Sequence, residues 1–234
     1  MNEQIDKETL RKLTRTLYMV QDTRIRMANR LHKKLNGEDQ KVVANINIEN
    51  ETLPILVDVW HDFEKQEKAL KKQIEIEVER FPIYTNFLSE VKGCGPLLSA
   101  VIITEFDINI ATTVSKMWAF AGLAPGRDRL VKGQKSCFNT FLRSKLCGVL
   151  GGSFLKCKSP YSVHYYEYKN RLENSESVTW KDATKIHIHR AAMRKMIKEF
   201  LKDLYVAWRT LEDLPMRRPY EEEYLGRSHH EEVI

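Results

Sequence analysis

Long apolar runs, glycine, proline and paired cysteines are all scarce in this sequence. No stretch of about 18 consecutive apolar residues occurs, so no membrane-spanning helix is predicted. Only 10 glycines and 7 prolines in 234 residues disfavour a turn-rich β-barrel or sandwich. Residues 1–8 are polar and acidic and do not have the pattern of a signal peptide. The four cysteines are Cys94, Cys137, Cys147 and Cys157. They form no C-x-x-C pair, which argues against a zinc knuckle or a disulfide framework.

The sequence contains enough apolar residues for a hydrophobic core, and its basic and acidic residues are concentrated in different segments. Hydrophobic residues make up 42% and charged residues 30%, which excludes wholesale disorder, and the net charge is +6. Residues 7–35 carry nine Lys/Arg against two acidic residues, 127–158 carry eight against one, and 185–209 carry seven against two. Residues 38–110 are acidic, with seven basic against fourteen acidic. Three basic segments favour a nucleic-acid partner, whereas any one alone is equally well a solvated helix face.

Two long amphipathic helices are predicted ahead of residue 80. Apolar residues recur at close to a 3.6-residue period over 7–35, with no glycine or proline, and Asn36-Gly37 is a stop signal. A second helix is predicted over 54–80. We expect residues 1–80 to form a helical hairpin or coiled-coil spacer, and the chain to form a homo-oligomer through it. The apolar side of the second helix is predicted to hold Leu56, Val59, Trp60, Phe63, Leu70, Ile74 and Val78.

The sharpest local motif lies within residues 83–106. A short helix is followed by Gly93 and Gly95, which flank one residue, and Pro96 then suits the first turn of a second helix. Two glycines allow a tight turn and close approach to a ligand, and the amides of a helix N-terminus favour phosphate. The pattern predicts a helix-hairpin-helix motif that contacts the DNA backbone, with Ala100 as the small residue where its helices cross. The alternative is a plain turn between two helices.

Two further blocks follow this motif. Residues 118–125 read Trp-Ala-Phe-Ala-Gly-Leu-Ala-Pro, and residues 133–143 contain Gly-Gln-Lys-Ser-Cys-Phe-Asn and then Leu-Arg. In this order the motifs resemble the C-terminal domain of DEDD-type insertion-sequence transposases, the one-ten family, which includes the Piv invertase and the bridge-RNA-guided recombinases. The stretch 24–31 and a basic C-terminal helix at 187–204 continue the resemblance, which covers roughly residues 10–225.

The resemblance implies a function in DNA transposition or site-specific recombination. We expect an all-α protein with the spacer at 1–80, a helix-hairpin-helix transposase-like domain at 81–225 and a polar tail at 226–234. Its partners would be DNA and a structured guide RNA, without a membrane, and its location the cytoplasm, associated with the nucleoid. The alternatives are a non-enzymatic DNA- or RNA-binding accessory or domesticated protein, and a purely structural helical oligomer.

Whether the chain is an enzyme stays open in the sequence. The family's RNase-H-like domain, whose four acidic residues hold divalent metal, has no predicted counterpart in the helical residues 1–80. We therefore expect no metal ligand and no cofactor, and we assign Asp58, Asp62 and Glu64 to a solvated helix face.

A candidate nucleophile and a set of DNA contacts follow from the resemblance. The family's catalytic serine precedes the Asn-x-x-Leu-Arg block, and Ser136 is the nearest serine, although Phe138 replaces a family glycine and the spacing is one residue short. A serine needs an activating base or charge, and the alternative is a polar residue in a DNA-facing loop. The predicted DNA contacts are Lys92, Gly93, Gly95, Arg127, Arg129, Lys132, Lys135, Arg143, Arg190 and Arg194.

The segment 185–208 is predicted to be an amphipathic basic helix. His187 and His189 are two apart and point in different directions on a helix, so they are not expected to form a zinc pair. Membrane-surface binding is the competing interpretation of such a helix. We expect Ile186, Ala192, Met193, Met196, Ile197, Phe200, Leu201 and Leu204 to face inward, and Arg190, Arg194, Lys195, Lys198 and Lys202 to face outward.

A tyrosine cluster precedes that helix. Tyr161, Tyr165 and Tyr168 recur at helical spacing, which predicts a core seam. The alternative, for the cluster as a whole with Tyr166 included, is stacking on unpaired bases.

Overall fold

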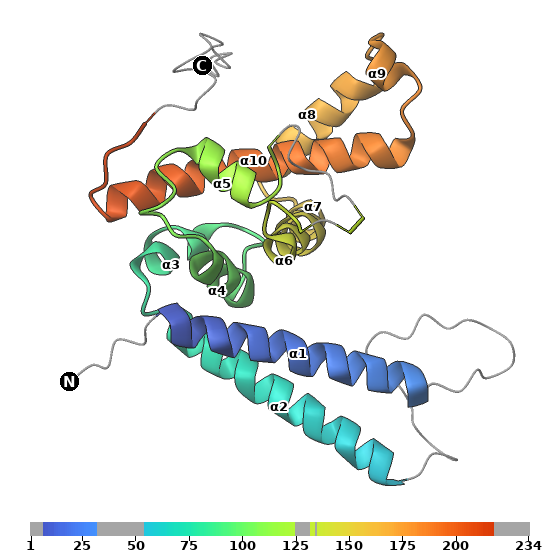
Figure 1. Cartoon of the computed structure of the whole chain (residues 1–234), viewed down its shortest axis with the longest axis vertical. Helices are drawn as coiled ribbons and strands as arrows, with labels where there is room; N and C mark the ends of the chain where they lie inside the picture. Colours follow the sequence, from blue (N-terminus) through green and yellow to red (C-terminus); the bar gives the residue numbers. More distant parts are fainter. Residues whose placement is uncertain (1–6, 32–53, 125–131, 134, 218–234) are drawn as a thin grey trace, which may run out of the picture. The chain divides into compact units, whose positions relative to one another are not determined.

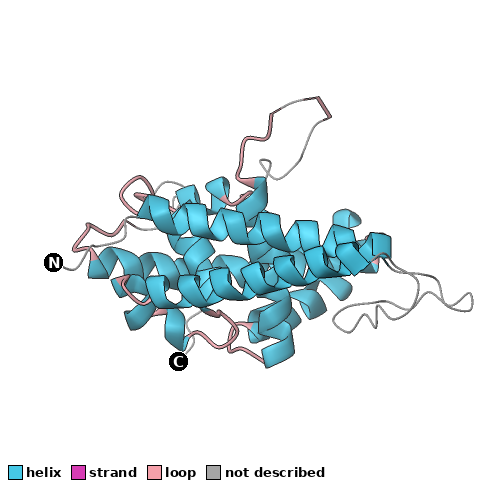
Figure 2. Cartoon of the chain, turned by 90° about the horizontal axis from the view of Figure 1, so that it is seen from below, coloured by secondary structure: helices cyan, strands magenta, loops and turns pink. Residues whose placement is uncertain are grey.

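The structure is a computed structural model of the chain, and it describes residues 7–31, 54–124, 132–133 and 135–217 (Figure 1). Every regular element in these ranges is a helix, and they contain no strand (Figure 2). The predicted all-α class is therefore confirmed for the described part of the chain. The chain divides into two compact units, Met1–Val78 and Glu79–Ile234, which are described separately below.

The described part of the first unit consists of two helices that pack along each other, α1 (Lys7–Leu31) and α2 (Pro54–Val78). The buried stripe of α1 includes Leu10 and Leu17, and that of α2 includes Ile74 and Val78, as their spacing predicts. The predicted apolar side of α2 is only partly buried, because Leu56 is 39% and Val59 37% exposed.

A buried carboxylate lies between the two helices of the first unit. The Glu67 side chain is 4% exposed and accepts hydrogen bonds from Arg24 Nε at 2.6 Å and Gln21 Nε2 at 3.1 Å. Lys71 Nζ lies 2.6 Å from Glu67 Oε1, the oxygen that also accepts the hydrogen bond from Gln21. Burial alone would raise the pKa of Glu67, but the hydrogen bonds from Lys71 and Arg24 outweigh it and hold that pKa below its ordinary value. The first unit thus has a polar layer within an apolar helix pair.

The second unit begins with the predicted hairpin region. Helix α3 (Pro82–Asn86) and a 3₁₀ turn (Leu88–Glu90) precede α4 (Pro96–Glu105), and both α-helices start with proline, which has no N–H to leave unpaired there. Helix α4 is buried from Ser99 onward, which explains its nearly continuous apolar sequence. Helix α5 (Val114–Phe120) follows.

One continuous helical segment then runs through α6 (Thr140–Arg143), a π-helical stretch (Ser144–Leu150) and α7 (Gly151–Cys157). Asn139 begins it, because its side-chain oxygen accepts a hydrogen bond from the amide of Leu142 at 3.0 Å. The Asn139 side-chain amide also donates to Glu105 Oε2 at 2.5 Å, which links the segment to α4. Wide π-helical turns inside α-helices are rare and often occur at functional sites.

The longest helix, α10 (Lys185–Leu211), is the centre of the second unit. It contacts α3, α5, α7 and α8 (Ser162–Glu173), and α9 (Val178–Lys181) lies between α8 and α10 in sequence (Figure 1). The predicted inward residues of α10 are buried except Ile186, which is 53% exposed. That prediction was wrong because Ile186 belongs to the first turn, and the buried stripe begins only at Ile188.

The tyrosine cluster forms a core seam, as predicted. Tyr161 stacks on Phe154, with ring centroids 5.3 Å apart, and meets the edge of Phe200. Tyr165 is 5% exposed, and its hydroxyl hydrogen-bonds His189 Nδ1 at 2.7 Å. Tyr168 packs against the cluster of Leu172, Ile188 and Ala191.

Candidate nucleic-acid interface

The hairpin turn packs closely against α7 at Gly93. Gly93 has φ +97°, and a Cβ there would lie 3.1 Å from Phe154 Cδ1 and 3.2 Å from Ser153 Oγ. The close approach that the motif predicts at Gly93 is therefore an approach to α7. A Cβ at Gly95 would meet no atom within 4 Å, and Lys92 is exposed. Only Lys92 and Gly95 of this turn offer an open surface to a ligand.

The first turn of α4 presents few amides to a phosphate. Pro96 has no N–H, and the amides of Leu98 and Ser99 both donate to the Gly95 carbonyl, at 3.1 and 3.0 Å. The Ser99 hydroxyl donates to the same carbonyl at 3.1 Å. The anion-binding interpretation of this helix N-terminus thus has less support from the geometry than from the sequence motif.

Ser136 lies in a local turn. Its hydroxyl donates to the Phe138 carbonyl at 2.9 Å and accepts from the Phe138 amide at 3.2 Å. Both contacts are with backbone, so neither partner is a base that could activate the hydroxyl. Lys132 and Lys135 beside it are exposed, while the predicted contacts Arg127 and Arg129 lie outside the described residues.

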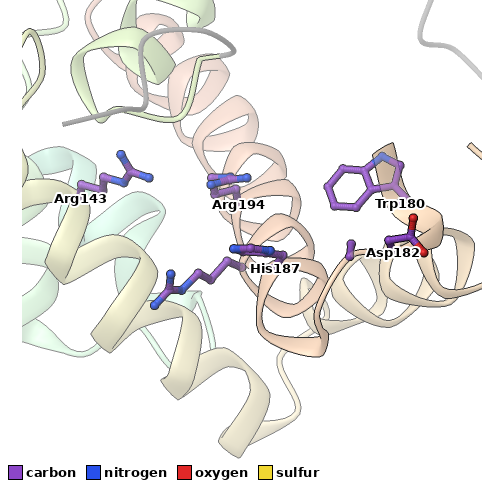
Figure 3. Close-up of a pocket in the computed structure, with 7 residues that line it drawn as sticks. Arg143, Trp180, Asp182, His187 and Arg194 are labelled. Carbon is purple, nitrogen blue, oxygen red and sulfur yellow. The ribbon is translucent and has the colours of Figure 1, made fainter. Parts of the chain in front are cut away.

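Three predicted DNA contacts meet at one surface pocket of about 500 Å³. Arg143 comes from the end of α6, and Arg190 and Arg194 come from α10, one turn apart. Figure 3 shows Arg143 on one side of the pocket and Trp180 on the other, with His187 and Arg194 from α10 between them. We call this site the arginine pocket. Its lining residues are Arg143, Trp180, Asp182, Ala183, His187, Arg190 and Arg194.

The electrostatics of the arginine pocket are strongly positive. Its lining contains three guanidinium groups and one carboxylate, that of Asp182. Burial raises the pKa of the nearby Cys147 thiol, and the charges of Arg143 and Arg194 oppose that rise, so both charges act on the same place. The Arg143 guanidinium also lies over the Phe138 ring, 4.9 Å from its centroid, which orients it.

A smaller hollow of about 210 Å³ adjoins the arginine pocket, since both are lined by Trp180 and Arg194. Leu123 and Ala124 of the Ala-Gly-Leu-Ala-Pro block line it, together with Lys195 and Lys198 from α10. Two of the motifs that carry the family resemblance, this block and the basic C-terminal helix, therefore meet at one surface.

Sequence reasoning missed Trp180 as a site residue and left the role of His187 open. Trp180 is half-buried on α9 and packs against the cluster of Leu172, Ile188 and Ala191. The available signal was an aromatic residue just ahead of a basic helix, which is a pattern of single-strand binding surfaces. His187 lines the arginine pocket, whereas His189 turns to Tyr165, so the prediction that the two histidines diverge is confirmed.

Among the described residues, no three His, Cys, Asp or Glu side chains gather as a metal site would require. No helix in the described part of the chain combines the length and apolar character needed to cross a membrane. No protein-family model matches the chain, and no curated protein and no solved structure is significantly similar to it.

Proposed function

We propose that this chain is a DNA-binding protein of transposition or site-specific recombination, which contacts the sugar-phosphate backbone through the arginine pocket and the adjoining basic face of α10. The observation that carries the proposal is the meeting of Arg143 with Arg190 and Arg194, which come from distant parts of the chain. Guanidinium groups pair with phosphate in a planar, two-pronged geometry and supply binding that is independent of sequence. The order of motifs supports the more specific assignment to transposition.

The apolar face of α10 argues for nucleic acid over a membrane surface. A helix that lies on a membrane must offer its apolar face to the lipid. In α10 that face is used within the protein, because Met196, Ile197 and Phe200 are each fully buried. The basic side of the helix includes Arg190, which is exposed. A polyanion fits that side.

We confine the proposed activity to binding. Ser136, the candidate nucleophile, hydrogen-bonds the backbone carbonyl and amide of Phe138, and neither group is a base that could remove the hydroxyl proton. In this proposal another component of the recombination machinery would perform strand cleavage and joining, and this chain would hold the DNA.

The test is an equilibrium titration of the full chain against a short labelled duplex, at several salt concentrations between about 50 and 200 mM. The variant replaces Arg143, Arg190 and Arg194 with alanine. Because each lost phosphate contact lowers the log–log salt slope by about 0.9, the slope should fall by up to about 3. Affinity at low salt should fall as well.

A matched control removes the same charge elsewhere on the second unit, by replacing Lys116, Lys156 and Lys169 with alanine. This control should keep most of the slope if the arginine pocket is the interface. Equal losses in both variants would mean that only overall charge matters. An absence of salt-sensitive binding in the wild-type chain would overturn the proposal and favour the structural-oligomer interpretation.

A further inference from the structure

We infer that the arginine pocket takes an unpaired nucleotide, with its base against Trp180 and its phosphate among Arg143, Arg190 and Arg194. This inference rests on the nucleic-acid binding proposed above and specifies the form of nucleic acid that the site accepts. The ligand class is a single strand or a base displaced from a duplex.

The concave shape of the site favours an unpaired nucleotide. A duplex backbone presents phosphates along a convex ridge, and exposed cations on a flat helix face are enough to contact it. The arginine pocket is instead a hollow of about 500 Å³, within the range of small-ligand sites, which is about 300–1,000 Å³. A hollow of this size can admit a base and its sugar, and a base inside a duplex cannot enter it without leaving the stack.

Trp180 supplies the surface that an unpaired base needs. The indole is half-buried, packs against Leu172, Ile188 and Ala191, and also lines the pocket. A ring held in this way can offer a face to a base without losing much side-chain entropy on binding. Bases in a duplex already stack on their neighbours, so stacking on Trp180 adds binding energy only for a base without stacked neighbours.

The cations lie where the phosphate of that nucleotide would be. Arg190 and Arg194 are separated by one helical turn, about 6 Å along α10. Arg143, from α6, lines the same pocket, and in Figure 3 it lies across from Arg194. In Figure 3, Trp180 lies on one side of the pocket with Asp182 beside it, Arg143 lies on the other side, and Arg194 lies between them, so the aromatic ring and the cations occupy different parts of the site. A nucleotide has the same division between base and phosphate. The neighbouring hollow shares Trp180 and Arg194 with this site.

The experiment compares Trp180→Ala and Trp180→Phe with the wild-type chain on three probes of one sequence: single-stranded DNA, single-stranded RNA and blunt duplex DNA. Stacking of one base on an aromatic side chain gives about a tenfold gain in affinity or more. We expect Trp180→Ala to lose at least tenfold in single-strand affinity and to keep its duplex affinity. Trp180→Phe should keep most of both, because phenylalanine retains a stacking face and the packing of the site.

A second measurement separates stacking from a general loss of fold. A strand that carries 2-aminopurine should lose fluorescence when the wild-type chain binds it, and this quenching should be absent in Trp180→Ala at saturating protein. The two single-stranded probes distinguish the sources of the nucleotide: equal affinities mean that the sugar is not read, and a preference for RNA means that the 2′-hydroxyl is.

The outcomes distinguish the inference from the proposed function. Duplex binding that depends on the three arginines, with single-strand affinity and quenching unchanged in Trp180→Ala, would overturn the inference and leave the proposed function intact. An absence of binding to any probe at low salt would overturn both. Equal losses of affinity for single-stranded and duplex probes in a folded Trp180→Ala variant would also overturn the inference. They would mean that Trp180 maintains the shape of the site and does not stack on a base.

Discussion

The hydroxyl of Ser153 donates a hydrogen bond to the backbone carbonyl of Gly93 at 2.8 Å, and so ties the hairpin turn to a helix 60 residues further along the chain. The turn therefore does not owe its shape to its own glycines alone. Phe154, the neighbour of Ser153, closes the space in which a side chain at position 93 would have to fit.

The two hairpin glycines should differ sharply when substituted. Gly93→Ala forces an L-residue into φ +97° and places its Cβ against Phe154 and Ser153, so we expect a loss of about 1–3 kcal/mol in the free energy of unfolding. Gly95→Ala meets open space and should change stability by no more than about 0.5 kcal/mol. Urea denaturation followed by circular dichroism measures both. Similar stabilities for the two variants would contradict this account of the turn.

Asn139 should be sensitive to isosteric substitution. Asn139→Ala removes the cap of α6 and the hydrogen bond to Glu105, which we expect to cost about 1–3 kcal/mol. Asn139→Asp keeps the cap but sets a second carboxylate against buried Glu105. Like charges at this distance favour protonation of one of them, so the deficit of Asn139→Asp relative to wild type should be largest near pH 7 and should shrink as the pH falls. A deficit independent of pH would contradict the direct Asn139–Glu105 contact.

Arg209 should be important for folding although it lies outside the proposed interface. Its side chain is 3% exposed and donates to the carbonyls of Ile108, Ala111 and Pro215, at 3.0, 3.2 and 2.8 Å. Arg209→Met leaves these carbonyls without that donor, and we expect a loss of more than about 2 kcal/mol. Thr210→Ala, at an exposed neighbouring position, is the control and should be nearly neutral. Thermal denaturation of the two variants tests the difference.

The stability of the first unit should depend on pH through Glu67. Its folded-state pKa is lowered, so its contribution is fully present above its ordinary value of 4.5 and is lost as the pH falls through the folded-state value. Glu67→Gln should therefore cost about 1–3 kcal/mol at pH 7, and the variant should lose less stability than wild type on acidification.

Urea titrations at several pH values between about 3 and 7 measure this effect. Glu64→Gln is the control, because Glu64 pairs with Lys68 in a much more exposed position and should change stability by less than about 0.5 kcal/mol. Parallel pH profiles for wild type and Glu67→Gln would show that the polar layer does not stabilise the helix pair.

Periodicity was sufficient to predict the long helices α1, α2 and α10 and most of their buried faces. The inward residues of α10 follow a regular stripe, and the same rule failed only at Ile186, where the helix has not yet entered the core. In α2 the rule over-assigned Leu56 and Val59, which are 39% and 37% exposed, and it did not predict that Glu67 is buried with partners on both helices.

The candidate site depended on contacts that no local pattern encodes. Arg190 and Arg194 were assigned from the basic face of one helix, and Arg143 from a motif, but nothing in the sequence brings these segments together. The fit of Gly93 against Phe154 is of the same kind. Trp180 is a site residue only because the fold brings it against residues of α10.

The unbroken helical segment that begins at Thr140 and ends at Cys157 sets a fixed distance between two parts of the second unit. Arg143 stands near its start, in the arginine pocket, and Ser153 stands near its end, where it holds the hairpin turn. The separation between them is on the order of 15 Å, and it cannot change unless the helix breaks. One rigid element therefore sets how far the arginine pocket lies from the hairpin turn.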